Sequence, residues 1–241
     1  MIRTLVVIPA FNEEFALPGV LADLRESVPE HDVLVVDDGS TDATALVASR
    51  EGVPVARLPF NLGVGGALRT GFRWAVENGY DAVVQFDGDG QHHAAEIPPL
   101  LDALAGGADM VIGSRFATDE TAYQVGRVRK GAMRLLRIAI RLLTGRRFTD
   151  TSSGFRAFSK PIVEHFSRNY PVEYLGDTVE AVLLALYGGF DVAEISVKMK
   201  ARAGGNPSTR NLKLIYHYFR VLLVIGLTVS FKARKMEGAR T

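Results

Sequence analysis

Cysteine is absent from the sequence. Disulfides, thiolate metal sites and a cysteine nucleophile are therefore excluded together, and any bound metal has to be held by oxygen or imidazole ligands. Internal repeats, low-complexity tracts and composition changes that would mark a linker are also missing. The chain has 241 residues, of which 47% are hydrophobic and 23% charged, so we expect a large globular unit with an ample core.

A large excess of charge is missing too. The formal net charge of +1 argues against a protein with a basic surface throughout, so we expect no nucleic-acid partner. The amino terminus passes from Met1 directly into a short apolar run at residues 5–8, and we expect no export signal. The apolar stretch at residues 221–229 is shorter than the roughly 20 residues that span a bilayer.

Short runs rich in β-branched residues alternate with helix-like patterns in the first half of the chain, which is typical of a parallel sheet built from βαβ units. Strands are predicted at residues 4–8, 33–36, 55–58, 82–86 and 110–112, and helices near 14–27, 42–50, 65–78 and 96–105. Ligands of such sheets bind beyond the carboxyl ends of the strands. The residues that directly follow each strand are therefore the first candidates for a site.

Two aspartates, Asp87 and Asp89, follow the fourth predicted strand with one glycine between them. This spacing lets both carboxylates face one cation, and Mg²⁺ or Mn²⁺ binds through one or two carboxylates while substrate phosphates complete the shell. The alternative is a solvated acidic turn. At the end of a central strand, however, paired and mutually repelling charges have little structural use. The pattern therefore predicts a divalent metal site that serves a diphosphate leaving group.

A second acidic turn, with Asp37 and Asp38, follows the second predicted strand. Such residues make ordinary turns and caps, but an acid at this place in nucleotide-binding sheets also reaches the base or the ribose, and we assign that reach to Asp38. The glycine-rich loop at residues 63–68 precedes a helix and can offer backbone N–H groups to a phosphate. Because Leu68 breaks the dinucleotide fingerprint, the loop argues against a hydride-transfer enzyme.

Eight cations and no acid lie between residues 127 and 147. At helical spacing, one face carries Lys130, Arg134, Arg137 and Arg141, and another carries Leu135, Ile138 and Leu142. An ordinary surface helix mixes charge signs, whereas a basic amphipathic helix suits an anionic membrane surface or an anionic substrate. Together with residues 221–229, it predicts a peripheral protein on the cytoplasmic face of the membrane, held there by lipid or by a small transmembrane partner protein.

Six segments carry a joint pattern, at residues 8–14, 35–42, 63–68, 87–92, 113–116 and 150–156. In this order they resemble family 2 glycosyltransferases of the dolichyl- or polyprenyl-phosphate mannose and glucose synthase type. The resemblance implies a GT-A fold, an α/β nucleotide-binding architecture with a mostly parallel sheet, over residues 1–211, and a helical tail over residues 212–241. It also implies Mg²⁺ or Mn²⁺, a nucleotide-diphosphate sugar donor, inversion at the anomeric carbon and a polyprenyl phosphate acceptor.

The resemblance also assigns roles by position in these motifs. The nucleotide side comprises Pro9, Phe11, Glu13, Val36, Asp38, Asp87, Gly88 and Arg202. The metal side comprises Asp87, Asp89 and Gln91, and the acceptor phosphate is assigned to Arg115, Arg129, Ser153 and Arg156. Two departures stand out. Phe11 occupies a place where the family often has Tyr, and Asn206 with Pro207 interrupts the usual ending of the loop that carries Arg202.

The acceptor decides which catalytic groups are needed. A phosphate monoester, with a second pKa of about 6, is already ionised, so its attack needs cations that screen two anions rather than a general base. In that case Asp177 and Glu180 orient the reactants. If the acceptor is instead a hydroxyl of a polysaccharide or soluble molecule, one of the two becomes the base. A non-catalytic nucleotide-sugar or lipid-binding module is the third alternative, and the joint presence of the metal, nucleoside and acceptor residues argues against it.

Overall fold

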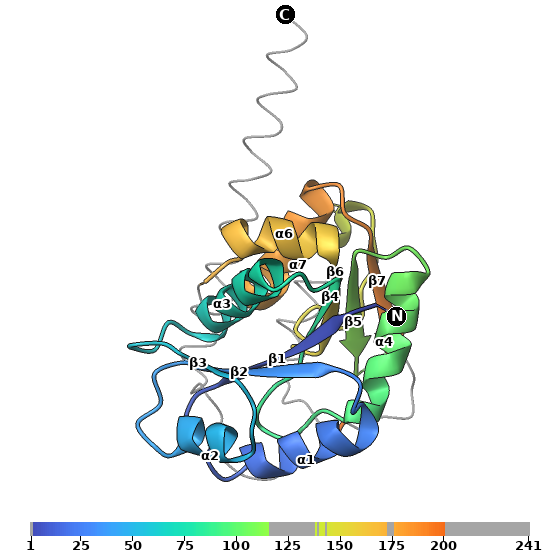
Figure 1. Ribbon diagram of the computed structural model, residues 1–241. Helices are drawn as coiled ribbons and strands as arrows, with labels where there is room; N and C mark the ends of the chain where they lie inside the picture. Colours follow the sequence, from blue (N-terminus) through green and yellow to red (C-terminus); the bar gives the residue numbers. More distant parts are fainter. Residues whose placement is uncertain (1, 116–137, 139, 143, 173–175, 201–241) are drawn as a thin grey trace, which may run out of the picture.

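The computed structural model describes residues 2–115, 138, 140–142, 144–172 and 176–200 (Figure 1). The first half contains β1 (Thr4–Ala10), α1 (Leu17–Ser27), β2 (Asp32–Asp37), α2 (Thr44–Arg50), β3 (Val55–Arg57), α3 (Val64–Glu77), β4 (Ala82–Gln85), the 3₁₀ turn η1 (Ala94–Glu96), α4 (Ile97–Ala105) and β5 (Met110–Ser114). The second half contains β6 (Arg156–Ser159), α6 (Lys160–Asn169), η2 (Gly176–Glu180), α7 (Ala181–Tyr187) and β7 (Val192–Ser196). The five predicted strands and four predicted helices are confirmed, with ends that differ by a few residues.

The described strands form one sheet in the order β3-β2-β1-β4-β6-β5-β7. Neighbours pair in parallel except around β6, which runs antiparallel to both β4 and β5. The mostly parallel sheet is thus confirmed, while β6 and α6 were not predicted. Arg156, the first residue of β6, pairs with Gln85 and with Ile112. Because β6 is reversed, the segment that precedes it arrives at the carboxyl ends of β4 and β5.

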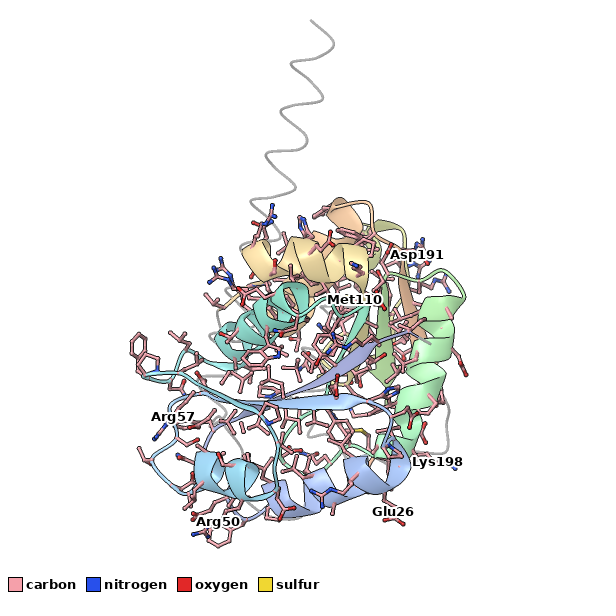
Figure 2. The ribbon with its side chains drawn as sticks, in the orientation of Figure 1. Glu26, Arg50, Arg57, Met110, Asp191 and Lys198 are labelled. Atoms are coloured by element: carbon pink, nitrogen blue, oxygen red, sulfur yellow. The ribbon has the colours of Figure 1, made fainter. Side chains whose placement is uncertain are left out.

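Helices cover both faces of the sheet (Figure 1). On one face lie α3, α6 and α7, and on the other lie α1, α2 and α4, each layer with its own hydrophobic cluster. The central strand β1 is buried along its whole length, as expected for a strand covered on both sides. Figure 2 shows Met110 inside the molecule and Glu26 and Arg50 at its periphery. These two layers hold the sheet rigidly, so its carboxyl edge is a fixed platform for a site.

The close fit of α3 against the sheet depends on glycine. A Cβ atom on Gly71 would lie 2.4 Å from Cγ1 of Val7 in β1, so a larger residue would push the helix outward. Beneath α3, Phe72, Phe158 and Tyr170 pack with ring centroids 5.0 Å apart around Phe72. The position of α3 also fixes the loop before it, which reaches the carboxyl edge.

Much of the basic helix and the whole segment 201–241 lie outside the described residues, as does the expected boundary at residue 211. Of the basic helix, Ile140 is buried in the core, whereas Ile138 is 46% and Leu142 81% exposed beside the exposed Arg141. Within the described part of the chain, every helix is too short or too polar to cross a bilayer.

Candidate active site

The segments that follow five of the strands meet a sixth segment at the carboxyl edge of the sheet. They follow β1, β2, β4, β5 and β7, and the sixth is the segment that leads into β6. The contacts between them are direct, since the backbone N–H of Asn12 donates to Oγ of Ser40 at 2.9 Å and that of Lys200 donates to the carbonyl of Gln91 at 2.7 Å. The motifs separated in sequence are therefore brought together, as the strand-end argument predicts.

The acidic turn after β2 holds its own backbone and the loop before α3. Oδ1 of Asp37 accepts the N–H of Ser40 at 3.0 Å, and its Oδ2 lies 3.3 Å from Nε of Arg57. Asp38 accepts the N–H groups of Leu62 and Gly63 at 2.7 and 2.8 Å. Burial raises the pKa of Asp38 above its ordinary value, although these two hydrogen bonds oppose the shift.

These contacts bear on two sequence interpretations. The N–H groups of Leu62 and Gly63 point at Asp38, so the start of the glycine-rich loop binds this carboxylate in the structure. The assignment of Asp38 to the nucleoside stays a prediction, and each of its oxygens accepts one hydrogen bond here and has room for a second. Glycine is required at position 39 of the same turn, because φ there is +72° and a Cβ atom would lie 2.7 Å from the backbone of Phe60.

The other nucleotide-side residues are placed at the ends of β1 and β2. Pro9 pairs in register with Val36, and both are buried. Phe11 follows β1 with 44% of its surface exposed, so its ring is accessible for stacking on a base. The backbone N–H of Glu13 donates to Oγ1 of Thr44 at 2.9 Å. Arg202 lies outside the described residues, and all five roles stay predictions.

The turn after β4 presents Asp87 and Asp89. Asp87 lies near Nε2 of Gln85 at 3.4 Å, whereas Asp89 accepts the backbone N–H of Gln91 at 3.0 Å and also its side-chain amide. Gly88 lies against β1, where a Cβ would stand 3.4 Å from a methyl carbon of Ile8. The turn is therefore packed on the sheet while its carboxylates remain only partly buried.

The donor atoms of this turn fit a hard divalent cation. Among the described residues there is no group of three or more His, Asp or Glu side chains arranged to hold a metal. Two carboxylates and one amide, Asp87, Asp89 and Gln91, leave most of a six-ligand shell to other oxygens, as for Mg²⁺ or Mn²⁺ bound together with a substrate diphosphate. Ligation by these three residues stays a prediction.

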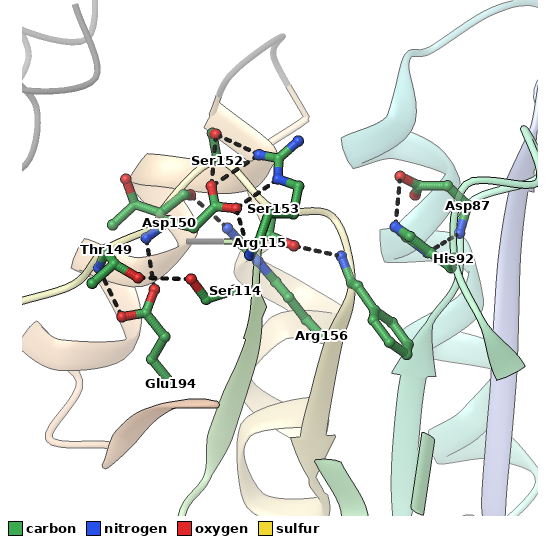
Figure 3. Close-up of polar contacts among 12 residues, drawn as sticks. Asp87, His92, Ser114, Arg115, Thr149, Asp150, Ser152, Ser153, Arg156 and Glu194 are labelled. Atoms are coloured by element: carbon green, nitrogen blue, oxygen red, sulfur yellow. Dashed lines mark hydrogen bonds and ion pairs between the residues drawn. The ribbon is translucent and has the colours of Figure 1, made fainter. Parts of the chain in front are cut away.

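Arg115 is held by a buried carboxylate (Figure 3). Its Nε lies 2.6 Å from Oδ2 of Asp150 and its Nη2 2.9 Å from Oδ1, while Nη2 also donates to Oγ of Ser152. Asp150 is fully buried. Burial acts to raise the pKa of Asp150, but the hydrogen bonds and positive charge of Arg115 outweigh it, so the pKa lies below its ordinary value. Arg115 and Asp150 thus form a fixed ion pair beside the turn that carries Asp87 and Asp89.

Glu194 of β7 supports this pair from behind. Its carboxylate accepts the backbone N–H groups of Thr149 and Asp150 at 2.7 and 2.6 Å (Figure 3). No local spacing in the sequence connects Glu194 to Asp150 and Thr149, which lie 44 and 45 positions away. It is the residue through which β7 fixes the direction of Asp150.

The other predicted acceptor residues differ in placement. Arg156 and Ser153 are buried, where Nη2 of Arg156 donates to the carbonyl of Thr151 at 2.8 Å and Oγ of Ser153 accepts the N–H of Phe155 at 3.2 Å. In the structure they shape the segment before β6, and their contact with an acceptor phosphate stays a prediction. Arg129 lies outside the described residues.

The two carboxylates considered as orienting groups or bases lie in η2. Glu180 is half-buried, and burial raises its pKa above the ordinary value. A raised pKa suits proton transfer as well as orientation, so the structure keeps both roles open for Glu180. The side chain of Asp177 lies outside the described part of the chain.

His92 contacts the turn that carries Asp87 and Asp89. It comes two residues before η1, and its Nδ1 accepts the backbone N–H of Asp87 at 3.1 Å while Nε2 lies 3.6 Å from Oδ2 of the same residue (Figure 3). Burial lowers the pKa of His92, with the charges of Asp87 and Asp89 opposing the shift. The donor in this contact is a backbone N–H, which has no signature in the sequence.

Comparison with known proteins identifies a family and several relatives. Residues 5–166 match the family described as Glycosyl transferase family 2. The chain is 40% identical over 161 residues to undecaprenyl-phosphate mannosyltransferase of Micrococcus luteus, which covers 65% of this chain and 66% of that protein. It is 31% identical over 215 residues to polyprenol monophosphomannose synthase of Mycolicibacterium smegmatis, which covers 84% and 79%.

A solved structure shares the fold. Glucosyl-3-phosphoglycerate synthase of Mycobacterium tuberculosis, in complex with Mn²⁺ and uridine-diphosphate-glucose, superposes with a TM-score of 0.70 at 24% identity, over 94% of this chain and 78% of that one. At this identity the likeness shows the fold, here the GT-A fold. The match to the family model covers more than half of the chain. The chain therefore belongs to glycosyl transferase family 2.

Proposed function

We propose that this glycosyltransferase moves a hexose from a nucleotide-diphosphate sugar to a polyprenyl phosphate, with inversion at the anomeric carbon. The observation that carries the proposal is the contact between the two halves of the site. The segment between Asp150 and Arg156 begins at the partner of Arg115 and passes within van der Waals distance of Asp87 at Gly154. A cationic acceptor side thus adjoins an acidic donor side. The names of the two mannosyltransferase relatives support the acceptor class.

The residues divide the work by charge. When bound, a divalent cation neutralises the diphosphate that leaves. Asp87 and Asp89 hold the donor at the end of β4, and Phe11 offers a ring for its base. Arg115, fixed by Asp150, screens the negative charge of the incoming phosphate. Since an ionised phosphate needs no deprotonation, Glu180 serves to orient the reactants.

The test uses two acceptors that differ by a single phosphate. Purified protein is incubated with UDP-, GDP- or dTDP-hexoses and either undecaprenyl phosphate or undecaprenol, with and without Mn²⁺ or Mg²⁺. We expect a lipid-linked sugar with the phosphate and metal together, and none with the alcohol. Transfer to undecaprenol or to an oligosaccharide, without transfer to the phosphate, would favour the hydroxyl-acceptor alternative in which Asp177 or Glu180 is the base.

The same proposal places the protein peripherally on the cytoplasmic face of the membrane. The exposed Ile138 and Leu142 flank the exposed Arg141, which combines apolar and cationic groups on one surface. We expect Leu142→Ser to weaken binding to anionic vesicles roughly 10- to 150-fold, since a buried leucine side chain contributes about 1.5–3 kcal/mol. The measurement is sedimentation with vesicles across a salt series.

A matched control is Leu46→Ser, because Leu46 is a leucine of α2 that is 50% exposed. Loss of binding in both variants, or in neither, would contradict the assignment of this surface. A chain that ends at residue 211 shows how much of the vesicle binding depends on the tail. Co-purification from a detergent extract tests whether a small transmembrane protein binds to the full-length chain.

A further inference from the structure

The imidazole of His92 is buried directly against Asp87, and the mechanism above does not use it. Only 3% of His92 is exposed. Two atoms of the ring face one residue, with Nδ1 3.1 Å from the backbone nitrogen of Asp87 and Nε2 3.6 Å from its Oδ2. His92 therefore meets both the backbone and the carboxylate of an acid that we assign to the donor.

The hydrogen bond fixes the tautomer of the ring. A backbone N–H is always a donor, so Nδ1 of His92 has to be the acceptor and carries no proton. The proton of the neutral ring then resides on Nε2, which faces Oδ2 of Asp87. The separation of 3.6 Å exceeds a hydrogen bond, so the polar edge of the ring acts on the carboxylate only through electrostatic attraction. The ring thus attracts the carboxylate to one side.

Packing on three sides prevents the ring from turning over. Phe155 stacks on it with centroids 4.7 Å apart and planes at 22°, and Phe86 meets it edge to face at 5.2 Å. Its backbone pairs with Met199 through a β-bridge, next to the hydrogen bond from Lys200 to the carbonyl of Gln91. The segment after β7 therefore clamps His92 and the acidic turn together.

Asp87 is confined from the opposite direction by a glycine. A Cβ atom on Gly154 would stand 2.7 Å from Oδ2 and 3.1 Å from Oδ1 of Asp87. The absence of a side chain at position 154 leaves room for the carboxylate, and His92 attracts it into that room. Gly154 belongs to the segment 150–156, and His92 stacks on Phe155 of the same segment. The segment that fixes Arg115 therefore also limits the orientation of Asp87.

We propose that His92 is a positioning residue, which holds the carboxylate of Asp87 in the orientation that binds the donor's metal diphosphate. The proposal rests on the donor role assigned to Asp87 and on no property of the acceptor. Residues that orient a metal ligand from behind typically change metal affinity 10- to 100-fold when replaced. A histidine that merely fills the core would affect folding but not this affinity.

The experiment compares three substitutions. His92→Phe keeps the ring packing and removes both nitrogens, while His92→Asn retains an acceptor near the place of Nδ1 and removes the group that faces the carboxylate. The matched control is His165→Phe, since His165 also packs beside two aromatic rings, Phe166 and Phe190, but belongs to α6. Thermal melting checks that each variant folds, and His92→Asn serves as the test if His92→Phe does not.

Binding of Mn²⁺ together with UDP or GDP is measured by calorimetry without any acceptor. We expect His92→Phe to bind the metal nucleotide about 10- to 100-fold more weakly, His92→Asn to lie between it and the wild type, and His165→Phe to match the wild type. In turnover, KM for the donor should rise while KM for the acceptor stays constant. Nitrogen NMR of the ligand-free protein should show an unprotonated Nδ1 in His92.

Each contrary result has its own meaning. Wild-type affinity in His92→Phe, or a proton on Nδ1, would overturn the positioning role and leave the proposed function intact. If the wild-type protein binds no metal nucleotide at all, both proposals fail. If it binds the nucleotide and the variants weaken as expected, but sugar passes only to a hydroxyl, the proposed acceptor is wrong and the role of His92 stands.

Discussion

Replacing Asp89 by alanine is expected to abolish metal-stimulated sugar transfer without unfolding the protein. Asp89 lies beyond the end of β4, where its carboxylate is partly buried and accepts hydrogen bonds from Gln91 of the same turn. A metal ion contributes several kcal/mol to stabilising the charge that develops on the leaving group, which corresponds to a loss of about 10³-fold or more in rate. Initial rates with and without Mn²⁺ and a thermal melt give the two measurements.

The control for this variant is Asp102→Ala, which removes an exposed carboxylate from the surface of α4. It should keep both activity and melting temperature. If Asp89→Ala retains most of its metal-stimulated activity, the acidic turn is not the metal site. If it melts far below the wild type, Asp89 is part of the structure rather than of the donor site.

The half of the fold with regular alternation was predictable from sequence because its signals are local. The residues of β1 form one apolar run, and polar turns follow β1, β2 and β4 at regular places. β6 is different. It has four residues, begins with the buried Arg156 and shows no apolar alternation, so its strand conformation depends on pairing with Gln85 and Ile112. Such tertiary pairing leaves no trace within the segment.

The site divides in the same way. The position of Asp87 and Asp89 was predictable, because the end of a strand and a spacing of two are visible in sequence. The hydrogen bonds that Glu194 accepts were not predictable. Their donors are the backbone N–H groups of Thr149 and Asp150, and a backbone donor has no sequence signature. For the same reason, the contact between His92 and the N–H of Asp87 could not be predicted.

Asp38 shows how a residue assigned to a binding motif can also have a structural role. Its place after β2 pointed outward to a nucleoside, yet in the structure it also fastens the loop at Leu62 and Gly63. An acid that both shapes the loop and borders the site makes a poor diagnostic variant, because its loss changes two things at once. Asp89 and Asp150 separate these effects better, and they are the two positions where we expect the largest changes.

Asp150→Asn is expected to cause the largest loss of stability among these variants. Asp150 is fully buried and the side chain of Arg115 is only 11% exposed, so the substitution leaves a guanidinium without its compensating charge. Breaking a buried pair in this way costs about 3–5 kcal/mol. For a chain of this size, that corresponds to a fall in melting temperature of roughly 6–20 °C.

The matched control is Asp191→Asn, which breaks the ion pair of Asp191 with Arg146. These side chains are 49% and 55% exposed, and the two atoms lie 2.7 Å apart, close to the 2.6 Å of the buried pair. Exposed pairs contribute at most about 1 kcal/mol, so this variant should melt within a few degrees of the wild type. Equal losses in both variants would show that burial does not set the strength of the Arg115–Asp150 pair.

The pH dependence of the same variant tests the charge itself. The pKa of Asp150 is lower in the folded protein than its ordinary value, so its ionised form stabilises the fold. That contribution is fully present above the unfolded pKa of about 3.9 and is lost as the pH falls through the folded value. The difference in free energy of unfolding between wild type and Asp150→Asn should therefore be constant near neutral pH and shrink below about pH 4. Urea unfolding across this range measures it, and a difference that stays constant in acid would mean that Asp150 acts through its shape and hydrogen bonds rather than its charge.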